Sequence, residues 1–370
     1  IKLLGLYDPE EFDLDIDMWI HSDGDQLKNI FLKLYKINFS DDAKEIMNIS
    51  VLTNSHYPKK NISNSEFLKF THSFTRTIGK SQLFCEEYSL NICNSYENLI
   101  NNKDIDVVVL ATPHTLHCQQ ITKAAEAKKH IFVEKPFTLT LKDAVTSYHY
   151  AKKNKVKIGV GFNRRFLPSL NYLKDISNQS SFGSKIHIEG NFSGPFGYDY
   201  NKEMWRGSLT ENPSGGMAAM GIHLIDAMIS VLGPIEAVQC ISKNNVLRNL
   251  DIDDTTSVQL WFTCGATGYI STLMATAPLW RLHLFGSNAW IQMNGPSEII
   301  SSFINQNTKT KLFSDTNIER LELESFAQSI LSNISYPISE EQVLNGVSAF
   351  EAISKSIKEN GSKVLINEIK

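Results

Sequence analysis

The sequence lacks any long apolar run and any excess of positive charge. No stretch of about 18 consecutive apolar residues, the length of a membrane-spanning helix, occurs among its 370 residues. Its net charge is −4 at pH 7 and no Lys/Arg cluster alternates with aromatic residues, whereas nucleic-acid binders carry basic patches. We therefore expect neither a membrane nor a nucleic acid as partner.

Cysteine is scarce and follows no metal-binding pattern. The cysteines are odd in number and none belongs to a Cys-x-x-Cys pair. Such a set predicts neither a disulfide framework nor a zinc site, so we expect no metal and a cytoplasmic location, where thiols stay reduced. The five are Cys85, Cys93, Cys118, Cys240 and Cys264.

Glycine is almost missing from the first 70 residues, where only Gly5 and Gly24 occur. Apolar residues at helical spacing predict a helix over 26–37, and the polar stretch 56–65 is typical of a loop. We interpret residues 1–70 as a separate N-terminal helical segment. It packs against the rest of the chain or docks a partner, and it contributes no chemistry.

From residue 71 to 160 the pattern alternates between strand and helix. Residues 105–111 form a β-branched apolar run, typical of a strand buried on both faces of a parallel sheet. Further strands are predicted over 70–75, 130–133 and 156–160, with amphipathic helices between them. This alternation indicates βαβ units. The predicted fold class is α/β with a Rossmann-like, doubly wound parallel sheet.

Residues 161–370 have a different pattern. Apolar and polar residues alternate over 186–192 and in parts of 257–262 and 268–274, which predicts an open-faced, mostly antiparallel sheet with one covered face. Two helices are expected to close the chain, the last over 340–359 with its apolar residues on one side. We predict an α+β domain here.

Three short stretches carry candidate chemistry, and the first two directly follow predicted strands. Ala111-Thr112-Pro113 ends the buried run and precedes His114 and His117. Ligands of open α/β sheets bind at the carboxyl ends of strands, and amides at the next helix start can hold a phosphate or ribose. An ordinary strand–turn–helix corner would give the same pattern.

The second stretch is Glu134-Lys135-Pro136. A lysine at such a position can hydrogen-bond a substrate hydroxyl, and the adjacent carboxylate can hold the ammonium or a ribose hydroxyl. Proline fixes the backbone beside them. Taken alone, the lysine would be assigned to the solvated surface.

The third stretch, residues 215–226, is rich in small residues and contains His223 and Asp226. Small residues allow a close approach of the backbone to a ligand, and residues three apart share one face of a helix. The near-neutral pKa of histidine suits proton transfer from an alcohol, although a capping or core histidine would fit as well.

In this order the stretches resemble the glucose–fructose oxidoreductase / inositol dehydrogenase (Gfo/Idh/MocA) family, from about residue 71 to the end. The resemblance implies an incomplete Rossmann domain at 71–160 and a substrate and oligomerisation domain at 161–370. It also implies hydride transfer between NAD(P) and a carbinol carbon of a sugar, cyclitol or polyol. The matching stretches are 106–114, 130–136, 161–166, 205–206 and 215–226.

Residue roles follow from the resemblance, motif by motif. Lys135 and His223 are implied to be catalytic, with His223 as the general acid–base. The implied substrate contacts are Arg165, Trp205, Arg206 and Asp226. The implied cofactor contacts are Thr75, Arg76, Ala111, Thr112, Pro113, His117, Glu134 and Lys135. The family's open sheet faces imply a homo-oligomer formed through the C-terminal sheet.

Two departures from the family pattern bear on function. Ala219 stands where many members have an aspartate four residues before the histidine, and residues 1–70 contain no Gly-x-Gly-x-x-Gly loop. We therefore expect the first strand and its phosphate loop to be replaced. Two alternatives stay open: a degenerate member serving as a binding protein, and a redox-assisted glycoside hydrolase.

The choice of cofactor is indicated by the end of the predicted second strand. Thr75-Arg76 stands there, where an acidic residue would accept the ribose hydroxyls of NAD. A hydroxyl beside an arginine suits the 2′-phosphate of NADP. The sequence favours NADP over NAD, with a surface arginine as the plainer interpretation.

Overall fold

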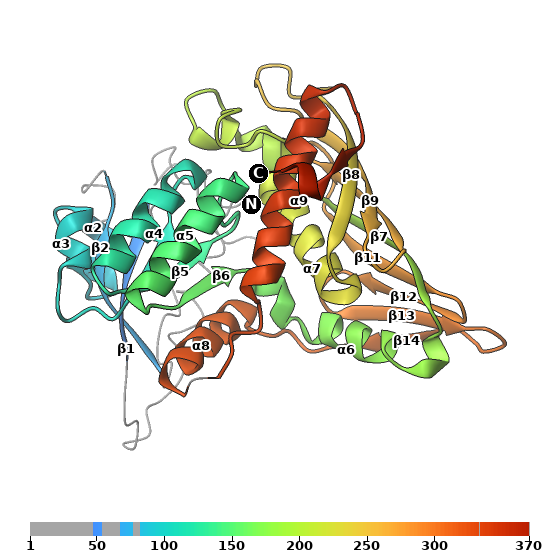
Figure 1. Cartoon of the computed structure of the whole chain (residues 1–370), viewed down its shortest axis with the longest axis horizontal. Helices are drawn as coiled ribbons and strands as arrows, with labels where there is room; N and C mark the ends of the chain where they lie inside the picture. Colours follow the sequence, from blue (N-terminus) through green and yellow to red (C-terminus); the bar gives the residue numbers. More distant parts are fainter. Residues whose placement is uncertain (1–46, 54–66, 77–81, 333, 370) are drawn as a thin grey trace, which may run out of the picture.

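Two sheets of different construction organise the chain. The computed structural model describes residues 47–53, 67–76, 82–332 and 334–369. A six-stranded sheet with its helices lies on one side of the molecule and a nine-stranded sheet on the other, with helices α8 (Ile318–Leu331) and α9 (Glu340–Lys358) between them (Figure 1). The predicted helix over 26–37 and the loop over 56–65 lie outside the described residues.

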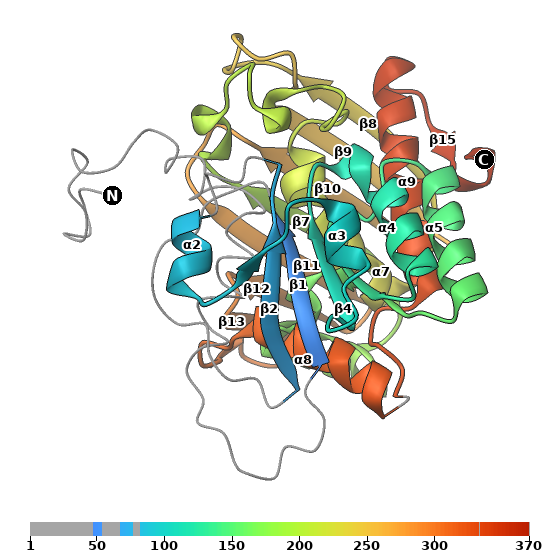
Figure 2. The same ribbon diagram turned by 90° about the vertical axis from the view of Figure 1, so that its left-hand side faces the viewer.

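The smaller sheet is parallel throughout and has the strand order β3-β2-β1-β4-β5-β6. This is the Rossmann order, and it confirms the predicted fold class. Figure 2 shows three of its strands, β2, β1 and β4, side by side. They are β1 (Met47–Thr53), β2 (Leu68–Phe74), β3 (Asn91–Ile92), β4 (Val107–Ala111), β5 (His130–Glu134) and β6 (Ile158–Gly161).

Strand β1 corrects the expectation that the first strand had been replaced. It pairs with β2 on one side and with β4 on the other, and Thr53 stands opposite Ala111. Part of the segment 1–70 therefore lies at the centre of the sheet. The prediction was wrong because it relied on the glycine loop to mark the strand, whereas the backbone pairing of β1 needs no glycine.

Both faces of this sheet are covered, which explains the continuous apolar run of β4. Val108 and Leu110 belong to a core shared with α4 and α5, while Val107 and Val109 face a second core that contains Leu323 and Phe326 of α8. Alternate residues of a strand point to opposite faces, so each face needs its own cover. The helices of this domain are α2 (Gln82–Glu87), α3 (Tyr96–Ile100), α4 (His117–Glu126) and α5 (Leu141–Asn154).

The larger sheet has the order β14-β13-β12-β11-β7-β10-β9-β8-β15. Only β7 and β10 pair in parallel, so the predicted mostly antiparallel sheet is confirmed. Its strands are β7 (Lys185–Ser193), β8 (Ile235–Lys243), β9 (Thr255–Phe262), β10 (Thr267–Leu273), β11 (Leu279–Gly286), β12 (Ala289–Asn294), β13 (Glu298–Phe303), β14 (Lys309–Leu312) and β15 (Val364–Leu365).

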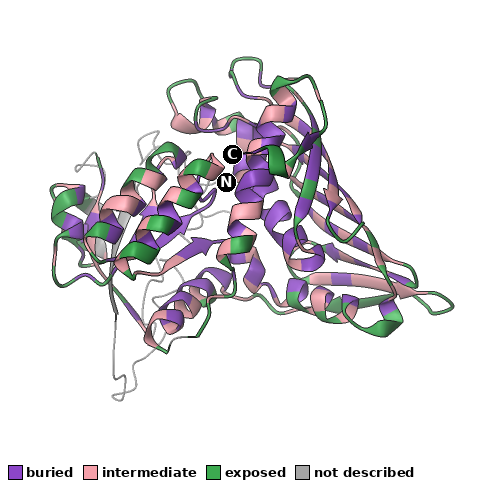
Figure 3. Cartoon of the chain, viewed as in Figure 1, coloured by how far each residue is buried: buried purple, intermediate pink, exposed green. Residues whose placement is uncertain are grey.

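Helices cover one face of this sheet. Helix α7 (Ile222–Leu232) is buried along almost its whole length (Figure 3), and α6 (Pro168–Ser177) packs on β12 and β13. Helix α9 begins at a capping box made by Ser339 and Gln342, which satisfies two backbone N–H groups at its start. Both predicted closing helices are confirmed.

Short helical turns join these elements. Most have 3-10 geometry: η5 (His114–Leu116), η6 (Asn163–Phe166), η7 (Ser180–Phe182), η8 (Phe196–Asp199), η9 (Trp205–Gly207) and η11 (Ile366–Glu368). A π-helical turn, η10 (Met217–Gly221), leads into α7.

Among the described residues no helix has the length and apolarity needed to cross a membrane. All five cysteines are free thiols.

Candidate active site

The candidate residues gather at the carboxyl edge of the parallel sheet. Thr112 follows β4, Glu134 ends β5 and Lys135 follows it, and Thr75 follows β2. Strand order reverses between β1 and β4, and dinucleotides bind where parallel sheets reverse their order. The edge therefore has the position that a dinucleotide requires.

Lys135 connects the two domains. Its ammonium donates a hydrogen bond of 2.9 Å to the backbone oxygen of Ala219, which lies in the π-helical turn before α7. The side chain is almost fully buried, and the peptide bond to Pro136 is cis. The structure thus joins the Glu-Lys-Pro stretch to the stretch that carries His223, as the sequence motifs imply.

His223 is the second residue of α7 and is 3% exposed. The turn before it depends on glycine: Gly215 has φ +55°, and a Cβ there would lie 2.1 Å from the backbone oxygen of Asp253. The centroid of the His223 ring lies 6.0 Å from that of Phe192 in β7. His223 follows Ala219, whose backbone oxygen binds Lys135, by four residues, and a histidine at such a helix start is suited to proton transfer from an alcohol.

His117, a predicted cofactor contact, faces backbone oxygens with both ring nitrogens. It is fully buried; Nδ1 lies 3.0 Å from the backbone oxygen of Pro136, and Nε2 lies 3.0 Å from that of Thr112. Burial lowers the pKa of His117 to about 4. Because the backbone engages both ring nitrogens, His117 fastens the corner after β4 to the corner after β5.

The other residues at the end of β4 (Ala111, Thr112 and Pro113, called the β4 corner) remain candidate cofactor contacts. The hydroxyl of Thr112 donates to Gln120 Oε1 at 2.5 Å, which fixes the start of α4. Ala111 ends β4 and Pro113 directly precedes η5. These residues therefore stand at the carboxyl edge beside the strand reversal, where the sequence predicts cofactor contacts.

Arg165 and Asp226 were predicted to bind substrate, but they bind each other. Arg165 Nε and Nη2 donate to the two carboxylate oxygens of Asp226 at 2.6 and 2.9 Å, and Nη1 donates to Gln342 at 3.3 Å. The side chains are only 5% and 7% exposed. These hydrogen bonds join η6 to α7 and α9.

Arg164 is the arginine that the sequence analysis missed. Its guanidinium carbon lies 4.5 Å from the ring centroid of Phe192 and 4.3 Å from that of Trp280. The sequence offered the Arg-Arg pair as a signal, but nothing in it distinguishes which of the two faces a partner. The structure assigns the ion pair to Arg165 and the aromatic stack to Arg164.

Trp205 and Arg206 contact each other and His114, which follows the β4 corner. The Arg206 guanidinium lies 4.1 Å from the Trp205 ring centroid, and that ring meets His114 edge-on at 5.0 Å. Glu211 accepts a hydrogen bond of 3.1 Å from the backbone N–H of Thr115. This group ties the segment after β7 to the same edge, so Trp205 and Arg206 stand beside the predicted site.

The buried carboxyl group of Glu322 interacts electrostatically with Lys135 and with two other buried carboxyl groups, Glu134 and Glu319. Glu322 of α8 is fully buried, and neither of its oxygens has a hydrogen-bond partner among the described residues. Burial raises the pKa of Glu322 well above its usual value, and the charges of Glu134 and Glu319 raise it further. Burial in this setting favours the neutral form of the carboxyl group over the charged form.

Thr75 and Arg76 follow β2, at the same edge. Thr75 is buried and Arg76 is exposed. An arginine in this place can reach a cofactor phosphate from the solvent side. Within the described residues no group of three or more His, Cys, Asp or Glu side chains is arranged to hold a metal ion.

Two family descriptions match consecutive parts of the chain. Residues 52–162 match the oxidoreductase family with an NAD-binding Rossmann fold, and residues 170–292 match the GFO/IDH/MocA C-terminal domain. Together they span more than half of the chain. The first match begins within β1, in agreement with the position of that strand in the sheet.

Curated relatives match about half of this chain or less. The uncharacterized oxidoreductase YrbE of Bacillus subtilis is 32% identical over 187 residues, 48% of this chain and 52% of the relative. Levoglucosan dehydrogenase of Pseudarthrobacter phenanthrenivorans is 29% identical over 152 residues, 41% of this chain and 39% of the relative. The chain thus spans about half the length, or less, of the curated relatives it matches.

Solved structures share the whole fold at low identity. Levoglucosan dehydrogenase in complex with NADH and levoglucosan superposes with a TM-score of 0.77 at 19% identity, covering 87% of this chain and 100% of that chain. An NAD binding oxidoreductase from Klebsiella pneumoniae gives 0.76 at 19% identity, covering 87% and 99%. At these identities the likeness establishes the arrangement of the two domains and nothing finer.

Proposed function

The chain belongs to the Gfo/Idh/MocA oxidoreductase family, and on that premise we propose that it is an NAD(P)-dependent oxidoreductase. It acts on the CH–OH group of a sugar, cyclitol or related polyol by hydride transfer. One observation carries the proposal: the hydrogen bond from Lys135 to Ala219 joins the carboxyl edge of the Rossmann sheet to the turn that leads into the helix bearing His223. The levoglucosan dehydrogenase relative supports the sugar class of substrate.

The residues at the carboxyl edge fit a dinucleotide. The β4 corner of Ala111, Thr112 and Pro113 would contact its ribose and phosphates, and Glu134 would accept a ribose hydroxyl hydrogen bond. The connection over 54–67 contains no glycine, but backbone N–H groups of any residue can donate to a phosphate. When bound, the cofactor supplies the hydride acceptor.

The chain's own residues move the proton. His223 accepts the hydroxyl proton as the C–H bond breaks, because neutral imidazole is a base near pH 7. The Lys135 ammonium, which carries three N–H donors, holds the substrate oxygen and favours its deprotonated form. Ala219 supplies no carboxylate, but its backbone oxygen orients Lys135 instead.

The cofactor preference is proposed to be NADP. Arg76 is exposed at the end of β2, and a planar guanidinium suits a 2′-phosphate. No acidic residue occupies positions 74–76 to accept the ribose hydroxyls of NAD.

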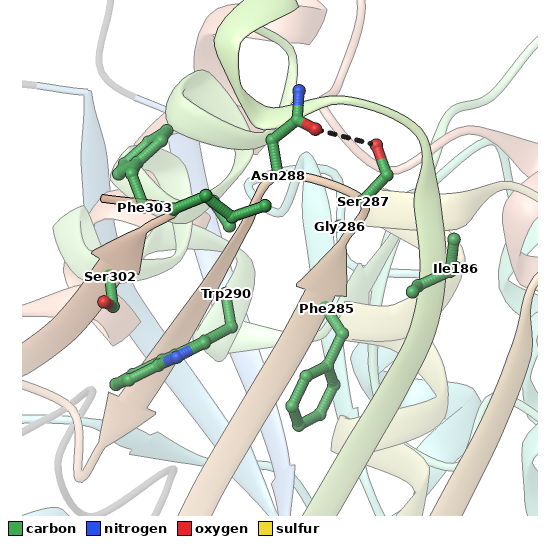
Figure 4. Close-up of a pocket in the computed structure, with 10 residues that line it drawn as sticks. Ile186, Phe285, Gly286, Ser287, Asn288, Trp290, Ser302 and Phe303 are labelled. Carbon is green, nitrogen blue, oxygen red and sulfur yellow. Dashed lines mark hydrogen bonds between the residues drawn. The ribbon is translucent and has the colours of Figure 1, made fainter. Parts of the chain in front are cut away.

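The open face of the nine-stranded sheet is the proposed homo-oligomer surface. A cavity of about 280 Å³ lies there between β7 and β11–β13, lined by Phe285 and Trp290 (Figure 4). Ile186 and Ile304 line it as well and are 51% and 64% exposed. Exposed apolar residues gathered around a hollow are typical of a protein interface.

Replacement of the proton-transfer residues tests the proposed chemistry. Lys135→Met and His223→Ala should each lower the rate of NADPH-linked turnover by about 10²- to 10⁴-fold, measured by absorbance on a panel of sugars and polyols. Lys123, whose side chain is 41% exposed, and the exposed His149 provide matched controls. Lys123→Met and His149→Ala should leave the rate unchanged. Near-normal turnover in either site variant would remove its assigned role.

A second candidate function is a binding protein without catalysis. The replacement of the family's aspartate by Ala219 and the lack of a glycine loop favour it. The two candidates differ in one measurable property, since only the oxidoreductase must bind NAD(P)H.

A further inference from the structure

Arg164 is held in a fixed orientation at the junction of the two domains. It belongs to η6, which directly follows β6 and the carboxyl edge of the parallel sheet. Its guanidinium stacks on Phe192 of β7 and Trp280 of β11, whose own rings meet edge-on at 5.2 Å. Two aromatic contacts from neighbouring strands hold the planar group in one orientation, because cations bind the faces of such rings.

The guanidinium has no ion-pair partner in the part of the chain that the structure describes. Among the described residues it makes no ion pair, and its buried Nε has no hydrogen-bond partner. Arg165, the next residue, binds Asp226 through two hydrogen bonds. A guanidinium carries five N–H donors, and leaving charged donors unpaired in a half-buried place is costly.

Glu319 interacts with the Arg164 charge but does not pair with it. Glu319 opposes the effect of burial, which lowers the pKa of Arg164 to about 10, so Arg164 is a cation at neutral pH. Glu319 itself accepts a hydrogen bond of 3.2 Å from Asn163. The Arg164 charge is therefore held in place without an ion-pair partner from the described part of the chain.

Arg164 and the proposed acid–base residue His223 share a neighbour, the ring of Phe192. The ring of Phe192 contacts the guanidinium of Arg164, and its centroid is 6.0 Å from that of His223. A group bound to Arg164 would thus belong to the same molecule that presents its hydroxyl to His223.

We propose that Arg164 binds an oxyanion of the substrate, so that the enzyme acts on an anionic sugar derivative, a sugar acid or a sugar phosphate. The planar fork of arginine matches both carboxylate and phosphate oxygens. This inference rests on the proposed oxidoreductase function and names the substrate class for the same site. The anion would supply the partner that Arg164 lacks among the described residues.

Ligands matched in shape but not in charge test the inference on the unaltered protein. With NADPH present, isothermal titration would compare glucuronate and glucose 6-phosphate with glucose. We expect one or both anions to bind at least tenfold more tightly than glucose, more weakly as salt rises, and the tighter one identifies the oxyanion. Glucose binding as tightly as both anions, or neither anion binding, would overturn the inference.

Variants then assign the effect to Arg164. Arg164→Met should lower affinity for the anion by about 10- to 100-fold, the usual loss for a charged hydrogen-bonded pair, with glucose unaffected. Arg164→Lys should retain part of the affinity. Equal loss for anion and glucose would show a structural role only. If the protein binds NADPH and oxidises glucose but neither anion, the proposed function stands and this inference fails; if no nicotinamide binds, the proposed function itself fails.

Discussion

Replacement of Arg165 by methionine tests whether the Arg165–Asp226 pair is structural. The variant leaves the Asp226 carboxylate, 7% exposed, without its two charged hydrogen bonds. Removal of one partner of a buried ion pair costs about 3–5 kcal/mol, because the remaining charge is desolvated and uncompensated. We expect the free energy of unfolding to fall by that amount, measured by urea denaturation followed by circular dichroism.

Two further variants make the measurement specific. The double change Arg165→Met with Asp226→Leu should recover most of the loss, since apolar replacement of both partners is often neutral. Lys123→Met breaks the exposed pair of Lys123 with Glu97, whose side chains are 41% and 57% exposed, and should cost less than about 1 kcal/mol. Unchanged stability of Arg165→Met, with weaker substrate binding, would restore the predicted substrate contact.

Three other predictions follow from the structure. Arg76→Ala should weaken NADPH binding at least tenfold and leave NADH binding unchanged in fluorescence titrations; equal effects on both would disprove 2′-phosphate recognition. Burial raises the pKa of Glu322, so the protonated carboxyl group contributes stability that is present below about pH 4.5 and is lost as the pH rises towards the folded-state pKa. Glu322→Gln should reduce this loss of stability, measured by thermal unfolding from pH 4.5 upward. An unchanged dependence of stability on pH in the variant would contradict this prediction. Deletion of residues 1–65 removes β1 and should abolish soluble expression, whereas a folded remainder would show that the sheet tolerates its loss.

Sequence patterns predicted the fold from residue 71 onward because burial leaves a periodic mark. The continuous apolar run of β4 required two covered faces, and the structure supplies them with α4 and α5 on one side and α8 on the other. The alternation in β7 and β9 required one covered face, and α7 supplies it for β7. Strand β1 was missed because its usual glycine signal is missing, not because its pairing differs.

The candidate site was predicted only where a motif fixes the backbone. The positions of Lys135 and His223 follow from a strand end and a helix start, which local sequence specifies. The roles of Arg164 and Arg165 depend on which side chain meets Asp226 and which meets Phe192, residues far away in the sequence. Composition and periodicity do not indicate which long-range contact each side chain makes. The roles of the two adjacent arginines therefore could not be distinguished from the sequence.

Binding of nicotinamide cofactor to the purified protein tests the central claim most directly. Fluorescence titration with NADPH and NADH should show saturable binding of NADPH below millimolar concentration, with a weaker response to NADH. The Lys123→Met control should bind NADPH as the unaltered protein does. Failure of both cofactors to bind at millimolar concentration would contradict the account and leave the binding-protein function in its place.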